Sequence, residues 1–213
     1  MPEVIVFKSI GFGHESILWK AEWDEAEHPR DPDGRFGDGN GNSREWSNDD
    51  QARFDAALNS WFRRGPNAGG TVSEENMRVM TDAVERRGSI ANEELYRGIG
   101  VSDPQAVLDQ FKVGTTFDMP ASSFTPQVDL ALRYTDAQWA EGEHPIIFVG
   151  LSPRNGGTMA LELESPYPGE PESVVAGRYE VVKIDTFETS VRASMWGEPK
   201  PRSGYQIWIK VAK

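Results

Sequence analysis

The chain has 213 residues, with 34 acidic against 22 basic side chains and a net charge of −12. This length suits one domain with an appendage, and the negative charge disfavours binding to nucleic acid through its phosphates. The absence of cysteine excludes disulfides and thiolate metal sites and favours a reducing compartment such as the cytoplasm. No stretch approaches the roughly 20 apolar residues of a membrane span, and residues 1–8 are expected to form a short strand, not a signal peptide.

Residues 24–46 are polar and rich in glycine, so they can bury little surface and are expected to form a linker. We therefore predict an N-terminal strand and linker over residues 1–46 and a globular domain over 47–213. Within the linker, Asp38, Asn40 and Asn42 alternate as in a calcium loop. Ser43 stands where that loop needs glycine and no glutamate fills its last liganding position, so we expect no metal.

Two amphipathic helices are predicted next. The first covers residues 48–64 after a capping Ser47, and the second covers 73–87, after a sequence at 71–74 that resembles a capping box, and stops at Gly88. Apolar residues recur in both at helical spacing, which predicts core packing. They are Phe54, Ala57, Leu58, Trp61 and Phe62 in the first helix and Met77, Met80 and Val84 in the second.

The rest of the chain predicts a strand at 93–98, a short helix after Asp103, and a helix after Thr125 with Val128, Ala131 and Leu132 facing the core. From residue 145 onward strands dominate. They cover residues 145–149, 158–163, 178–184 (after a turn at 176–177) and 205–211. Helices first and strands later predict an α+β domain, with N-terminal helices packed on a mostly antiparallel, two-sheet β core.

The first candidate site residue is Arg97, which lies inside a predicted strand and is followed by Gly98. A charged side chain within a strand needs a partner, and a glycine beside it would let a ligand approach the backbone. Arg97 and Gly98 therefore suit a phosphate or ribose clamp. An edge-strand arginine paired with a surface carboxylate would explain the same two residues.

The second candidate is the pair Ser122 and Ser123, just before the helix at Thr125. Hydroxyl groups at this point could orient a carboxylate by hydrogen bonding, or they could simply cap the helix.

The third candidate is the acidic turn at residues 167–172, which runs into a strand-like segment at 173–175. Glu170 and Glu172 are one residue apart, so in an extended segment they project to the same side. Two like charges this close are costly unless a reaction uses one to stabilise a cation and the other to take a proton. A solvated acidic loop is the alternative.

In this order, the arginine strand, the serine pair and the Glu-x-Glu turn resemble the ADP-ribosyltransferases of the arginine–serine–glutamate clade. The resemblance covers residues 50–190 and rests on residues 95–98, 121–126 and 170–175. Ala121 departs from it, because the family has a Ser-Thr-Ser sequence here. Residues 28–36 are also similar to linkers of bacteriophage structural polyproteins, which would fit a phage-encoded protein.

The resemblance implies a mono-ADP-ribosyltransferase that breaks the nicotinamide–ribose bond of NAD and transfers ADP-ribose to arginine. It implies that Glu172 stabilises the ribosyl cation and that Glu170 takes a proton from the acceptor. A glutamine at position 170 would have indicated a different acceptor. Arg97 would hold NAD, and Tyr167 would stack on the target's guanidinium or pack within the turn.

The same resemblance assigns Gly98, Ser122 and Ser123 to NAD binding, with the serines also anchoring Glu172. It implies NAD as substrate, no metal, and a monomer that modifies a target protein in the cytosol of a host or target cell. Two alternatives remain open. One is an NAD glycohydrolase that uses water as acceptor, and the other is a non-catalytic phage structural or adaptor domain associated with the virion.

Overall fold

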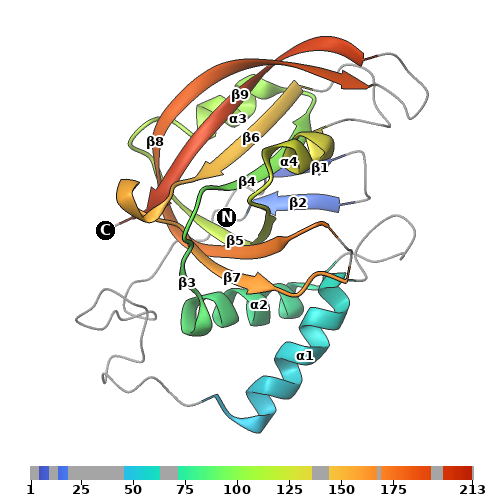
Figure 1. Ribbon diagram of the computed structural model, residues 1–213, viewed down its shortest axis with the longest axis vertical. Helices are drawn as coiled ribbons and strands as arrows, with labels where there is room; N and C mark the ends of the chain where they lie inside the picture. Colours follow the sequence, from blue (N-terminus) through green and yellow to red (C-terminus); the bar gives the residue numbers. More distant parts are fainter. Residues whose placement is uncertain are drawn as a thin grey trace.

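The structure is a computed structural model that describes residues 5–9, 14–18, 46–62, 72–135, 144–166, 169–192 and 199–212. These residues form an α+β fold whose sheet is mostly antiparallel, as the sequence predicts (Figure 1). The helices are α1 Asn48–Phe62, α2 Glu74–Arg87, α3 Pro104–Gln110 and α4 Val128–Thr135. The strands are β1 Ile5–Ser9, β2 His14–Leu18, β3 Ser89–Ile90, β4 Leu95–Val101, β5 Thr116–Phe124, β6 His144–Gly150, β7 Met159–Leu163, β8 Glu172–Arg192 and β9 Pro199–Val211.

Strand β8 is the longest of the described strands and pairs with three others. Its beginning pairs with β7, residues 173–180 pair with β5, and residues 179–192 pair with β9. The described strands of this sheet follow the order β3-β7-β8-β9-β6-β4, with β5 also on β8, and β6-β9 is the parallel pair among them. The two expected sheets are therefore two halves of one hydrogen-bonded sheet, joined through β8 (Figure 1).

The turn predicted at residues 176–177 is wrong, because β8 runs straight through it. Gly177 pairs with Met119 of β5 and has a φ of 111°. Glycine adopts this region without the steric cost that other residues meet. The glycine therefore marks an irregular point within a long strand and not the end of one.

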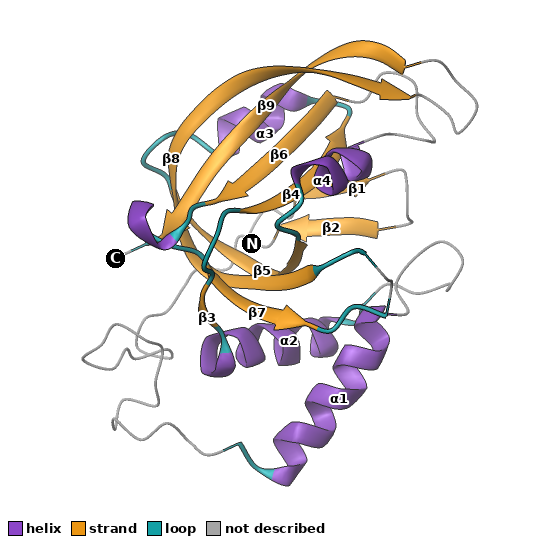
Figure 2. Cartoon of the chain, in the orientation of Figure 1, coloured by secondary structure: helices purple, strands orange, loops and turns teal. Residues whose placement is uncertain are grey.

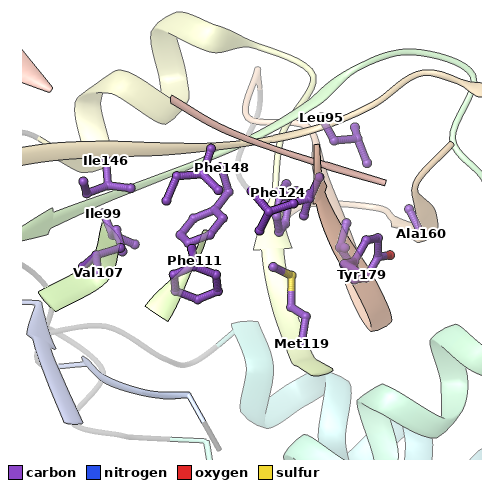
Figure 3. Close-up of a cluster of buried hydrophobic side chains, with 14 of the residues drawn as sticks. Leu95, Ile99, Val107, Phe111, Met119, Phe124, Ile146, Phe148, Ala160 and Tyr179 are labelled. Atoms are coloured by element: carbon purple, nitrogen blue, oxygen red, sulfur yellow. The ribbon is translucent and has the colours of Figure 1, made fainter. Parts of the chain in front are cut away.

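The main core lies between the two halves of the sheet, where aromatic side chains meet edge to face (Figure 3). The ring of Phe111 lies 4.8 Å from that of Phe117 and 5.2 Å from that of Phe148, measured between centroids. Such pairs add to the stabilisation that burial alone provides. Tyr179 is fully buried beside them and donates its hydroxyl to backbone carbonyl oxygens.

Helix α2 covers the outer face of the β5-β7-β8 half, and α1 packs on α2 (Figure 2). The predicted Ser47 cap of α1 is confirmed, since its Oγ accepts from the backbone N–H of Asp50. In α2 the cap is Ser73, whose side chain accepts from the N–H of Asn76, so a capping box that begins at Thr71 is not the arrangement found. These caps satisfy backbone donors that the first helical turn leaves unpaired.

Helix α4 packs on β4 and β6. Ala131 is fully buried in this contact, as predicted, and Leu132 packs partly against it. The prediction for Val128 is wrong: it is 39% exposed at the start of the helix, and Leu130 is buried instead. Val128 is the first residue of the helix, where a side chain can face solvent, and the buried residues begin at Leu130.

Residues 19–45 lie outside the described residues, so the predicted linker and domain boundary stay predictions. Among the helices that the structure describes, none has the length and hydropathy to cross a membrane.

Candidate active site

The two halves of the sheet meet a second time where β4 passes the end of β5. The backbone N–H of Tyr96 donates to the carbonyl of Thr125 at 2.7 Å, and Thr125 returns the bond at 2.9 Å. Because Thr125 lies two residues after Ser123, this bridge brings the strand of Arg97 next to the strand of the serines.

Arg97 extends from this bridge and is half-buried. Its Nη1 donates to the backbone carbonyl oxygen of Ser123 at 3.2 Å. This bond gives the strand arginine a backbone partner on the serine strand. A guanidinium has several N–H donors in a planar fork, so one backbone bond can orient it while others meet an anionic group.

The two serines point to opposite faces of β5. Ser122 lies opposite Val175, is 8% exposed, and donates its hydroxyl to the carbonyl of Pro120 at 2.8 Å. Ser123 lies opposite Val174. Directly opposed residues of an antiparallel pair share a face, and so do alternate residues of one strand. Ser123 therefore shares its face with Glu172, and Ser122 does not.

Ala121 is held against helix α2. The pairing of β5 with β8 shifts register between Met119 and Ser122, and within this irregularity the N–H of Ala121 donates to Thr81 Oγ1 at 3.0 Å. Ala121 is 3% exposed and belongs to the apolar cluster under the helices. The residue in place of the expected first hydroxyl is thus a packing residue, and the helix hydroxyl fixes the start of the serine segment.

Glu172 is the first residue of β8, opposite Leu163 of β7, and is half-buried. Its Oε1 accepts a hydrogen bond of 2.8 Å from Nε1 of Trp61. Trp61 lies in the last turn of α1 and is 2% exposed. The sequence placed Trp61 only in the apolar stripe of its helix. A buried indole N–H needs an acceptor, but no local pattern points to one 111 residues away.

Glu170 precedes β8 in the turn and is half-buried. Of the two predicted carboxylates, Glu172 alone lies on the strand. Gly169 before them has a φ of 79°, which glycine readily adopts in a tight turn. Tyr167 lies outside the described residues, so its predicted role stays a prediction.

Gly98 lies where helix α4 approaches the sheet. A side chain at this position would meet the backbone carbonyl of Ala131 and the side chain of Thr135. The glycine therefore allows the helix to approach the strand closely, and its predicted part in NAD binding stays a prediction.

The neighbouring Tyr96 lies on the α4 side of β4 and donates its hydroxyl to Glu94 Oε2 at 2.8 Å. Burial, and secondly this bond to Glu94, raise the pKa of Tyr96 to about 12, so it stays protonated at neutral pH. Within the described ranges, no group of three or more histidine or carboxylate side chains could hold a metal ion.

No family model matches the sequence, and no curated protein matches it. Similar solved structures include the Vis toxin, an ADP-ribosyltransferase from Vibrio splendidus, at 14% identity and a TM-score of 0.44, covering 80% of this chain and 76% of that one. The enzymatic component C2-I of the Clostridium botulinum C2-toxin matches at 12% identity and a TM-score of 0.42, over 79% of this chain and 44% of that one. C3larvin toxin, an ADP-ribosyltransferase from Paenibacillus larvae, matches at 14% identity and a TM-score of 0.38, over 80% of this chain and 90% of that one. Because these sequence identities and TM-scores are low, we infer the function from the residues of this chain.

Proposed function

We propose that the protein is a mono-ADP-ribosyltransferase that cleaves NAD at the nicotinamide–ribose bond and transfers ADP-ribose to an arginine of a target protein. The observation that carries the proposal is that Arg97 bonds to the backbone of Ser123, whose side chain shares a face with Glu172. The three residues come from β4, β5 and β8. The resemblance in their sequence order supports the same chemistry.

Glu172 is the residue that we assign to the reacting ribose. Cleavage of the bond between ribose C1′ and the nicotinamide nitrogen sends the bonding electrons to nicotinamide and leaves a cation like that of glycoside hydrolysis. A carboxylate beside the ribose stabilises this cation more than it stabilises the bound substrate, so it accelerates the chemical step. Ser123 supports the placement of Glu172 on their shared face.

Arg97 is assigned to an NAD phosphate. A guanidinium can bind phosphate through two parallel N–H donors, whereas a lysine ammonium acts as a point charge. The bond to the Ser123 carbonyl orients Arg97 before substrate binds. We therefore expect that lysine cannot replace this arginine.

Glu170 is assigned to the acceptor. A free arginine has a pKa above about 12, so its guanidinium is a poor nucleophile until a proton leaves. Glu170 would take that proton as the guanidinium nitrogen forms its bond to C1′. Its place in the turn before β8 keeps it separate from the carboxylate that is fixed by Trp61.

The test is incubation of the protein with NAD labelled in its adenosine part and an arginine-containing acceptor protein. Nicotinamide release and label on the acceptor are measured separately. Glu172→Gln should lower both by more than a hundredfold, while Glu170→Gln should abolish labelling and spare nicotinamide release. The matched control is Glu188→Gln, since Glu188 is exposed and lies far along the same strand.

Each other outcome has a distinct meaning. Free ADP-ribose without acceptor label would show that water is the acceptor and would overturn the arginine assignment. No nicotinamide release under any condition would remove the enzymatic proposal and favour a non-catalytic structural or adaptor domain. Equal loss of hydrolysis and transfer in Glu170→Gln would contradict the separate roles of the two carboxylates.

A further inference from the structure

The hydrogen bond from Trp61 to Glu172 joins helix α1 directly to the candidate catalytic carboxylate. An indole N–H is a donor only, so the direction of this 2.8 Å bond is fixed: Trp61 donates and Oε1 of Glu172 accepts. A carboxylate has room for several donors, so this bond occupies one position on Oε1 and is compatible with a ribose hydroxyl bound to the same group.

The indole that makes this bond is held by packing. Trp61 is 2% exposed and belongs to the cluster between the helices and the sheet. The same cluster contains Val174, two residues after Glu172 on β8, and Ala57, one turn before Trp61 on α1. The donor and the strand that carries the acceptor are thus fixed in one packed body, which leaves the carboxylate little freedom to rotate.

We propose that Trp61 is a positioning residue that sets the orientation of the Glu172 carboxylate for catalysis. The inference rests on the proposed function, and it assigns part of the site to helix α1. A carboxylate that serves the transition state must be placed closely, because displacement by about 1 Å can cost roughly a hundredfold in rate. Loss of Trp61 should therefore lower kcat and leave binding of NAD, which we assign to Arg97, nearly unchanged.

The variant is Trp61→Phe, which keeps an aromatic ring and removes the N–H donor. The matched control is Trp46→Phe. Trp46 is partly buried and packs against the same cluster, where its ring centroid lies 5.7 Å from that of Phe54, but its buried Nε1 has no hydrogen-bond partner among the described residues. Both variants lose similar aromatic surface from one cluster, so a general effect of repacking would appear in both.

The assay measures kcat and KM for nicotinamide release. For Trp61→Phe we expect kcat to fall about tenfold to a hundredfold, the range for loss of a hydrogen bond to a charged group, with KM for NAD within about twofold. Trp46→Phe should keep a kcat within about threefold of the wild type. In a Glu172→Gln background, Trp61→Phe should have a much smaller effect, because the two residues act through one contact.

A second measurement detects the contact without activity. The indole N–H resonance of Trp61, identified by its loss in Trp61→Phe, should move upfield in Glu172→Ala, while that of Trp46 should stay in place. An unchanged Trp61 resonance would show that the contact is not formed and would overturn the inference. A wild-type kcat in Trp61→Phe would overturn it as well, while the proposed function would stand. A wild-type protein that releases no nicotinamide would remove both.

Discussion

Replacement of Gly98 by alanine tests how closely helix α4 approaches the arginine strand. An added Cβ would overlap the carbonyl oxygen of Ala131 and would lie 2.8 Å from that residue's carbonyl carbon and 2.8 Å from Cγ2 of Thr135. Carbon atoms prefer separations of about 3.5–4.0 Å. The helix would therefore have to move by at least about 0.7–1.2 Å, the difference between these values and the 2.8 Å found, and the closer carbonyl oxygen requires more.

Overpacking of this kind costs about 1–3 kcal/mol, and we expect the upper end because the obstacle is backbone. Alanine also lowers the conformational entropy of the unfolded chain, which offsets about 0.4–1 kcal/mol of this loss of stability. The net loss is about 2 kcal/mol, or a decrease in Tm of about 4–8 °C for a chain of this size. Thermal and urea denaturation of Gly98→Ala measure it.

Gly177→Ala is the comparison, because it meets no neighbour within 4 Å and its cost comes from a φ of 111°. We expect a loss of about 1–2 kcal/mol there from backbone strain, with α4 undisturbed. If Gly98→Ala were as stable as the wild type, the close packing of α4 on β4 would be refuted.

Two further predictions concern hydroxyl groups that bond to the backbone. Tyr179→Phe should cost about 1–3 kcal/mol in urea denaturation, because the carbonyls of Met159 and Ala176 lose their donor at 3.0 and 3.2 Å. Burial raises the pKa of Tyr179 above its ordinary value, so the tyrosine's contribution to stability is complete below pH about 10 and decreases above it. If the free energy of unfolding declined equally in the wild type and in Tyr179→Phe from pH 10 to 11, this reasoning would be contradicted. Thr81→Val should lower the free energy of unfolding by about 1 kcal/mol, because it removes the acceptor of the Ala121 N–H. It should also lower nicotinamide release by displacing the serine segment. Unchanged stability and activity would argue against a role of the Thr81 hydroxyl in holding this segment.

Local patterns predicted the helices well. The apolar spacing in α1 and the serine before it correctly gave a helix with Phe54, Ala57 and Trp61 buried, because helical period and capping are properties of neighbouring residues. Val128 was misplaced, since a helix's first residue can face solvent even when it fits the apolar spacing.

Long-range geometry could not be predicted from the sequence. Glycine at position 177 signals a turn locally, but pairing with β5 and β9 carries β8 through it. The sequence named both serines, and only the register with β8 separates Ser123 from Ser122. The partner of Trp61 depends on packing between α1 and β8, which no sequence period encodes.

We propose that the carboxylate of Glu172 stabilises the ribosyl cation during cleavage of NAD. The most direct test is the rate of nicotinamide release by the wild type, by Glu172→Gln and by the Glu188→Gln control. Glutamine keeps the size of the side chain and can still accept from Trp61, but it lacks the negative charge that stabilises the ribosyl cation. We expect release by the wild type and the control and a loss of more than a hundredfold in Glu172→Gln. Release by Glu172→Gln at the wild-type rate would contradict the proposal.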